Sequence, residues 1–144
     1  EIMPSLVGSE MCIETGHEFP FGKVKLTLAF HGSGIAGGHA CGFIVHFDGS
    51  VFYFAGDTGL FADMELIGKR NAIDYAFLPI GDNFTMGPDD AAYAAGLLKA
   101  KTVIPIHYNT WPLIDQDPEE FKNVVEKETS SKVLIVPCGT RVDL

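Results

Sequence analysis

Short apolar runs that alternate with helical patterns are the feature that most constrains how this chain can fold. The runs have the length of β-strands and are too short for buried helices. They cover residues 24–30, 41–47, 51–55, 74–80, 102–106 and 132–137. Helical patterns cover residues 60–69 and 88–98 and start again at Pro118. Strands and helices in this order predict a layered α/β domain.

Local signals place the ends of several of these elements. Asp48-Gly49, between the second and third runs, predicts a β-hairpin. The third run is apolar at every position, which predicts a strand in the middle of a sheet. Pro88 and Pro118 each precede acidic residues, as expected in the first turn of a helix. Residues 1–22 are interrupted by glycine and proline and predict no element.

Length and charge limit the classes of function. A chain of 144 residues fits a single domain, residues 1–144. Ten Lys and Arg side chains against 19 Asp and Glu give a net charge of −9. That charge repels a phosphate backbone, so nucleic acid is an unfavourable partner. The chain has no apolar run of the roughly 18 residues that a membrane helix needs, and no signal-peptide pattern at its start, so no membrane partner is expected.

Three residues that can bind metal directly follow apolar runs. His31, Asp57 and His107 each begin the loop after a predicted strand. If those strands share one sheet and one direction, the three side chains converge at one edge of it. Two imidazoles and a carboxylate are ligands for Zn²⁺, Mn²⁺ or Fe²⁺. A structural alternative stays open for each: a hydrogen-bonded histidine at a strand end, and an aspartate that forms a turn or caps a helix.

The cysteines are expected at packed positions, and the other histidines are not expected to bind metal. Cys12, Cys41 and Cys138 are widely spaced and form no CxxC motif. This pattern indicates reduced thiols and a cytoplasmic setting, and we interpret the cysteines as small buried side chains. His46 alternates with apolar neighbours and is expected at an exposed strand position. The histidines that are not predicted to bind metal are His17, His39 and His46.

Several segments resemble one family. FYFAGDTGLF at residues 52–61 resembles the Gly-Asp-Thr strand end of the metallo-β-lactamase superfamily. AFHGSG at 29–34 and IPIHYNTWP at 104–112 look like the segments that carry its middle and last metal-binding histidines. LPIGDNFTMGP at 78–88 and QDPEEF at 116–121 narrow the resemblance to the UPF0173 metal-dependent hydrolases. The resemblance begins near the first of these histidines and runs to the C-terminus.

The resemblance implies an αββα sandwich, of which this chain holds the C-terminal half: a mostly buried sheet with helices on its outer face. It implies two divalent metal ions, with Zn²⁺ favoured and Mn²⁺ or Fe²⁺ as alternatives. Asp57 would be the catalytic residue that bridges the ions, and His31 and His107 would each hold one ion. The implied reaction is hydrolysis, in which a metal-activated hydroxide attacks an ester, amide or phosphodiester of a small molecule.

Further residues are expected around these ligands. Asn109 or Thr110 would supply hydrogen bonds that orient the metal ligands. The segment 82–86, with Asp82 and Thr85, would form part of the substrate wall. An ordinary loop between a strand and a helix is an equal alternative for this segment.

The chain departs from the family in one respect. Superfamily members carry His-x-His-x-Asp-His in their N-terminal half, and no two histidines of this chain are separated by one residue. We interpret the chain as the C-terminal part of a hydrolase whose first half lies upstream of Glu1. The uncovered sheet face should then be apolar and be covered by the missing half or by a second chain, and the isolated chain should be inactive. The alternatives are a phosphodiesterase or nuclease of the same superfamily, and a noncatalytic binding protein that has lost the motif.

Overall fold

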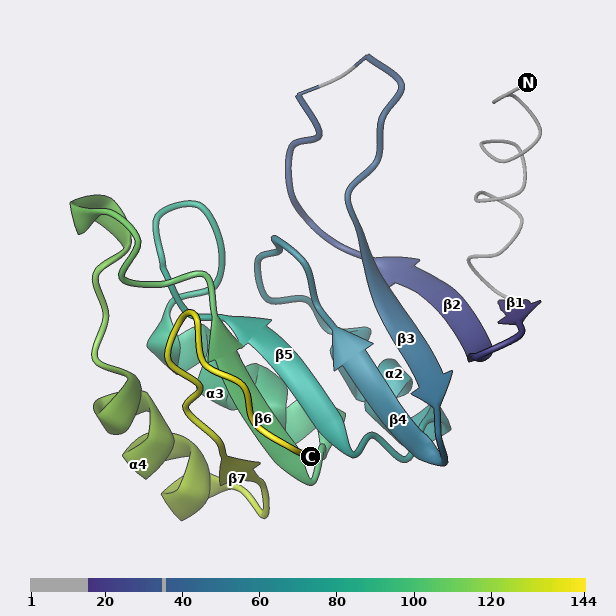
Figure 1. Cartoon of the computed structure of the whole chain (residues 1–144). Helices are drawn as coiled ribbons and strands as arrows, with labels where there is room; N and C mark the ends of the chain where they lie inside the picture. Colours follow the sequence, from purple (N-terminus) through teal and green to yellow (C-terminus); the bar gives the residue numbers. More distant parts are fainter. Residues whose placement is uncertain (1–15, 35) are drawn as a thin grey trace.

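Within residues 16–34 and 36–144, which the computed structural model describes, seven β-strands form one sheet in the order of the sequence (Figure 1). The strands are β1 His17–Phe19, β2 Gly22–Leu28, β3 Cys41–Phe47, β4 Ser50–Phe54, β5 Tyr75–Pro79, β6 Thr102–Ile106 and β7 Lys132–Val133.

The strand directions bring several strand ends to one edge of the sheet. Neighbours from β1 to β4 are antiparallel, and neighbours from β4 to β7 are parallel. β2, β4, β5 and β6 therefore run in the same direction, and their carboxyl ends share one edge, called the carboxyl edge below. In α/β folds this is the edge at which loops build binding sites.

The helices found among the described residues are α2 Met64–Arg70, α3 Pro88–Leu98, α4 Pro118–Glu128 and the short 3₁₀ helix η1 Pro112–Ile114. Proline begins α3 and α4, as the sequence predicts. The Asp117 carboxylate caps α4 by accepting hydrogen bonds from the amides of Glu119 (2.8 Å) and Glu120 (3.3 Å). None of the helices in the described part of the chain is long and apolar enough to cross a membrane.

The helices cover one face of the sheet. Figure 1 shows α2 and α3 behind the central strands. Gly68 of α2 lies so close to the carbonyl oxygen of Leu98 in α3 that a Cβ would overlap it, so a small residue lets the two helices approach. The core between helices and sheet is apolar and includes Ile44, Tyr53, Ala76, Leu78, Ala91, Ala95 and Val103.

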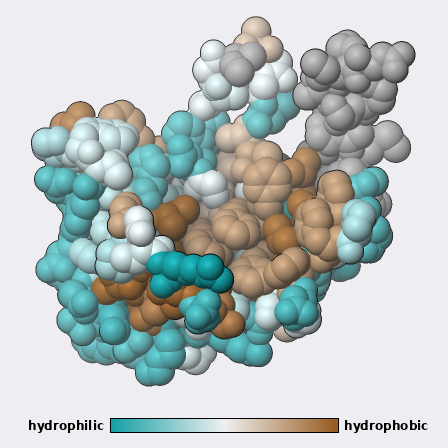
Figure 2. All heavy atoms as spheres, in the orientation of Figure 1, coloured by the Kyte–Doolittle hydropathy of each residue, from teal (hydrophilic) through white to brown (hydrophobic). Residues whose placement is uncertain are grey.

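The opposite face of the sheet is apolar and open. Side chains that alternate with the core residues point to this face, and Phe43 and Phe54 are exposed there. Phe54 stacks on Phe77 with ring centroids 4.3 Å apart, and Phe52 stacks on Tyr75 at 5.3 Å. Figure 2 shows an apolar area over these strands, bordered by hydrophilic residues. The uncovered face is apolar as expected, but the sheet is buried on its helix-covered face only, which corrects the expectation of a mostly buried sheet.

Three elements differ from their predicted bounds by two residues or more. The first strand ends at Leu28 rather than residue 30, because its partner strand begins at Cys41. Helix α2 starts at Met64 rather than residue 60, and Phe61 packs into the core ahead of it. The last strand ends at Val133 rather than residue 137, since its pairing with β6 stops there.

Other expectations about the elements are confirmed. Residues 41–47, 88–98 and 102–106 form elements with the predicted bounds. β4 lies in the middle of the sheet, and Asp48 and Gly49 form the hairpin turn with φ values of 47° and 77°. The sequence did not predict β1, because a three-residue strand carries too little periodicity to be recognised.

Candidate metal centre

The loops after β2, β4 and β6 carry the three predicted metal ligands. His31 and Asp57 follow β2 and β4 after short turns, and His107 directly follows Ile106, the last residue of β6. Because the three strands run in the same direction, all three residues lie at the carboxyl edge of the sheet. The prediction that the three residues lie together required their strands to share one sheet and one direction, and the topology meets this condition.

Asp57 and His107 approach each other at this edge. Nε2 of His107 lies 3.9 Å from Oδ1 of Asp57, and the two side chains are 23% and 49% exposed, respectively. Zinc bonds to histidine nitrogen and to carboxylate oxygen are each about 2.0–2.2 Å long. An ion between these two atoms is therefore within reach of both, and the pair fits a shared metal ion.

The ring of His107 is held tightly on its other side. Nδ1 is buried and has no hydrogen-bond partner among the described residues. A Cβ added at Gly81 would lie 3.0 Å from Nδ1 and would overlap the carbonyl oxygen of His107. The backbone of His107 has a φ of 55°, a left-handed conformation that is uncommon outside glycine and concentrates at functional sites. This packing keeps Nε2 turned toward Asp57.

His31 is exposed, and its own loop orients its ring. Nδ1 of His31 donates a hydrogen bond to the carbonyl oxygen of Gly32 (2.8 Å). Because a carbonyl oxygen only accepts, Nδ1 carries a proton, and in the neutral imidazole Nε2 is then the nitrogen with the lone pair that a metal ion needs. Two hydrogen bonds hold this loop against the Gly-Asp-Thr loop: Phe30 N donates to Thr58 Oγ1 (2.9 Å), and Gly59 N donates to Phe30 O (3.1 Å).

The predicted ligands do not form a closed cluster. Among residues 16–34 and 36–144, no group of three or more His, Cys, Asp or Glu side chains is close enough to hold a metal ion. His31 stands apart because it lies in an exposed glycine-rich loop, whereas His107 is fixed at a strand end. The donor types suit Zn²⁺, but a catalytic zinc ion usually takes three protein ligands. The assignment of His31, Asp57 and His107 as ligands stays a prediction.

Asn109 and Thr110 follow His107 in an exposed loop. Oδ1 of Asn109 accepts a hydrogen bond from Gln116 N (2.7 Å), and Asn109 N donates to the carbonyl oxygen of Ile114 (2.9 Å). The Asn109 side chain therefore stabilises the loop that contains it. Its predicted role in orienting the metal ligands, like that of Thr110, stays a prediction.

The loop with Asp82 and Thr85 lies beside the Gly-Asp-Thr loop. Met86 N donates a hydrogen bond to the carbonyl oxygen of Thr58 (2.9 Å), which joins the two loops. Within the first loop, Thr85 N donates to the Asp82 carbonyl (3.2 Å), and Asp82 has a φ of 60°. Asp82 is exposed and Thr85 is half-buried. This position is compatible with a substrate wall, which stays a prediction.

Two residues that the sequence did not single out contact His107. Gly81 packs against its ring, as described above, and Trp111 meets it edge to face with ring centroids 5.9 Å apart. A glycine directly after a buried strand was the available signal for the first. Trp111 belongs to the segment 104–112, but no local pattern predicted its contact with His107, because that contact depends on how the loop after β6 folds back.

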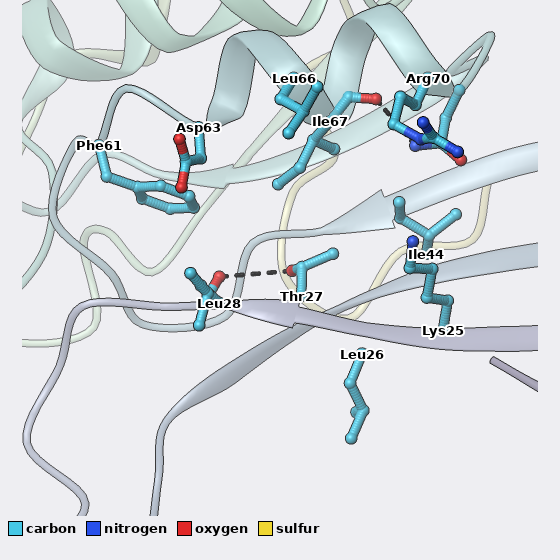
Figure 3. A pocket seen from close by; sticks show the side chains of 11 residues that line it. Lys25, Leu26, Thr27, Leu28, Ile44, Phe61, Asp63, Leu66, Ile67 and Arg70 are labelled. Carbon is cyan, nitrogen blue, oxygen red and sulfur yellow. Dashed lines mark hydrogen bonds between the residues drawn. The ribbon is translucent and has the colours of Figure 1, made fainter. Parts of the chain in front are cut away.

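An apolar cavity of about 170 Å³ lies elsewhere, between β2 and α2 on the helix-covered side (Figure 3). Thr27, Phe61 and Ile67 are among the residues that line it, and neither Asp57 nor His107 does. The cavity is therefore separate from the candidate metal centre. His17, His39 and His46 are all exposed, as expected for His46 in particular.

Comparisons of the sequence with known families identify its class. A family model described as the Beta-lactamase superfamily domain matches residues 9–108. A UPF0173 metal-dependent hydrolase of Pelotomaculum thermopropionicum is 56% identical over 130 residues, which are 85% of this chain and 57% of that protein. One of Natranaerobius thermophilus is 54% identical over 127 residues, 88% of this chain and 57% of that protein. The chain belongs to the metallo-β-lactamase superfamily and, within it, to the UPF0173 family.

Solved structures agree on the fold. Igni18 from Ignicoccus hospitalis, described as a novel metallo hydrolase, superposes with a TM-score of 0.80 at 44% identity, over 85% of this chain and 53% of that one. Isothiocyanate hydrolase from Delia radicum gut bacteria has a TM-score of 0.70 at 20% identity, over 91% of this chain and 57% of that one, and shows the fold alone. The expected metallo-β-lactamase fold is confirmed. The chain spans a little over half the length of these relatives.

Proposed function

We propose that this chain supplies part of the metal centre of a divalent-metal hydrolase that acts on an ester, amide or phosphodiester of a small molecule. The observation that carries the proposal is the 3.9 Å separation of His107 Nε2 from Asp57 Oδ1 at the carboxyl edge. The two bacterial relatives are named metal-dependent hydrolases, and Igni18 is described as a metallo hydrolase. These names support the class of reaction.

Each predicted ligand has its own role in this proposal. Asp57 would be the catalytic residue shared by two divalent ions, and His107 and His31 would each help to hold one of them. When bound, the two divalent ions, with Zn²⁺ favoured and Mn²⁺ or Fe²⁺ as alternatives, lower the pKa of a water molecule toward neutrality and offset negative charge that develops on the substrate. Asp57 is 49% exposed, so solvent and substrate reach its carboxylate.

The remaining ligands, and the cover for the open sheet face, are proposed to come from outside this chain. The chain matches 57% of the length of each of the two bacterial relatives, so an unmatched part of those proteins can supply both. Exposing an apolar face that includes Phe43 and Phe54 to water raises the free energy, which favours a second layer on it. A second copy of this chain is the competing occupant.

The proposal is tested by comparing the full-length protein with the isolated 144-residue chain. Metal content after dialysis is measured first, followed by hydrolysis of a panel of esters, amides and phosphodiesters with and without a chelator. We expect the full-length protein to retain divalent metal and to lose its activity with the chelator. The isolated chain is expected to be inactive, because the ligands that its residues bring together are too few to hold an ion.

Two outcomes would contradict the proposal. Chelator-resistant hydrolysis by either protein would overturn the role of the metal. Full-length protein that binds no divalent ion would support a noncatalytic binding protein instead. Sedimentation of the isolated chain tests the sheet cover: we expect self-association through the open face, and a stable, soluble monomer would argue that the face needs no second layer.

A further inference from the structure

Phe84 and Trp111 form an exposed aromatic pair beside His107. The Trp111 ring lies 5.9 Å from the imidazole of His107 between centroids, with an interplanar angle of 76°. The Phe84 ring lies 6.2 Å from that of Trp111, tilted by 47°. Phe84 is 50% exposed and Trp111 is 43% exposed. Large aromatic rings that stay half in water next to candidate metal ligands leave apolar surface that a ligand can bury.

The two loops that carry this aromatic pair are fixed to each other. Nδ2 of Asn83 donates a hydrogen bond to the carbonyl oxygen of Leu113 (2.6 Å), which links the loop after β5 to the loop after β6. The fully buried Ile114 anchors the second loop, and its amide donates to the carbonyl oxygen of Trp111 (3.0 Å). Because the pair is held in place before any ligand arrives, little conformational entropy is lost on binding.

We propose that Phe84 and Trp111 bind an aromatic group of the substrate that is attached close to the hydrolysed bond. This inference rests on the proposed hydrolase function of the site. Trp111 contacts the ring of His107, so a substrate whose reacting centre faces His107 and Asp57 brings its nearest substituent against the aromatic pair. A planar ring gains most from that position, since it can stack on or meet the edge of both side chains. The site therefore selects aryl esters, amides or phosphodiesters over those with small alkyl groups.

The test uses two probes that differ only in the group in question. Phenylphosphonate and methylphosphonate present the same anion to a metal ion, and neither is hydrolysed. Binding to the full-length, Zn²⁺-loaded protein is measured by calorimetry. We expect phenylphosphonate to bind about tenfold more tightly than methylphosphonate, a difference typical of one buried aromatic contact.

Variants assign that difference to the aromatic pair. Trp111→Ala and Phe84→Ala should each remove most of the preference for phenylphosphonate over methylphosphonate. Tyr93→Ala is the matched control, because Tyr93 is an aromatic residue of α3 that is 64% exposed and is not part of the pair. Trp111 is the only tryptophan of this 144-residue chain, so wild-type fluorescence minus that of Trp111→Phe reports on this side chain. Phenylphosphonate should quench that signal more strongly than methylphosphonate.

The outcomes separate this inference from the function on which it rests. Equal affinity for the two phosphonates, or a phenyl preference that survives both alanine variants, would overturn the aromatic binding surface while the metal centre stands. A Trp111 signal that resists acrylamide in the full-length protein without ligand would also overturn it, since the ring would then be covered. The metal centre itself would be overturned if neither phosphonate binds the metal-loaded protein and a chelator does not inhibit its hydrolytic activity.

Discussion

Gly81 lies so close to His107 that a Cβ at position 81 would overlap the carbonyl oxygen of His107 and would come within 3.0 Å of its Nδ1. Gly81→Ala should therefore displace the backbone that presents the His107 ring. We expect a loss of about 1–3 kcal/mol in the free energy of unfolding, and weaker metal binding by the full-length protein. Urea denaturation and metal titration measure the two effects.

Gly96→Ala is the control for that substitution. Gly96 lies in α3, and its added Cβ would meet only Thr129 Cγ2, at an ordinary contact distance of 3.6 Å. Alanine inside a helix should stabilise the protein by roughly 0.5–1 kcal/mol relative to glycine. If Gly81→Ala unfolds at the same urea concentration as the wild type, Gly81 is not packed as described.

Asp57→Ala should reduce metal binding and activity far more than stability. The side chain of Asp57 is half exposed, so its removal leaves no apolar cavity. At 3.9 Å from His107 Nε2, its carboxylate makes a weak ion pair at most. In the full-length protein we expect metal affinity to fall at least tenfold. The unfolding free energy of the metal-free protein should stay within about 0.5 kcal/mol of the wild type.

Asp63→Ala is the control, because Asp63 has an exposed carboxylate that makes no capping hydrogen bond. Unchanged metal content in Asp57→Ala would remove Asp57 from the ligand set.

Tyr53→Phe should keep or raise stability at neutral pH. The Tyr53 hydroxyl is buried without a hydrogen bond of acceptable geometry among the described residues, although the hydroxyl of Thr27 is nearby. Removing a buried polar group that lacks a partner is neutral or favourable by up to about 1 kcal/mol. A clear loss of stability in urea denaturation would mean that the hydroxyl has a partner after all.

The raised pKa of Tyr53 also predicts how the stability of the protein changes at alkaline pH. Burial raises the pKa of Tyr53 from 10.0 to about 12, and the Thr27 hydroxyl offsets part of that rise. The folded state therefore holds the phenol proton more tightly than the unfolded chain does, and the contribution to stability is complete below pH 10 and is lost as pH rises toward about 12. Tyr53→Phe should lose less stability than the wild type across that window. Parallel curves for the two proteins would contradict the raised pKa.

The lowered pKa of Asp74 predicts how the stability of the protein changes at acid pH. Its carboxylate accepts hydrogen bonds from Lys101 Nζ (2.7 Å) and from the Val51 amide (2.8 Å), and these hold the pKa of Asp74 below its usual 3.8. The stabilisation is present above the unfolded pKa and is lost as pH falls through the lower, folded value. Asp74→Ala should cost about 1–2 kcal/mol at pH 7, since the Val51 amide loses its acceptor.

Glu65→Gln is the matched control for Asp74. Glu65 pairs with Lys69 on the exposed surface of α2, where solvent screens the interaction, so its loss should leave the urea midpoint unchanged. Thermal unfolding from pH 7 to pH 2 compares the variants. An acid transition in Asp74→Ala that matches the wild type would mean that Asp74 does not link β4 to the segment before β6 in the folded state.

Local signals predicted most of the fold because they depend on neighbouring residues. The apolar run at 41–47, the Asp48-Gly49 turn and the proline starts at 88 and 118 each concern residues within one turn or one strand. Phe61 shows where such signals fail: the apolar pattern that includes Phe61 continues into α2, but Phe61 packs into the core ahead of the helix, which begins at Met64. Periodicity reports which residues are apolar, and tertiary packing decides where the helix begins.

The sequence by itself determined that His31, Asp57 and His107 follow apolar strands and that these segments resemble one superfamily. Only the tertiary structure decided that β2, β4 and β6 run in the same direction and place these residues at one edge. It also decided that His107 approaches Asp57 to 3.9 Å while His31 stays in an exposed loop. Strand propensity is a local property, whereas the distance between residues far apart in the chain depends on strand pairing and loop packing. Those in turn depend on which surfaces bury the most apolar area together.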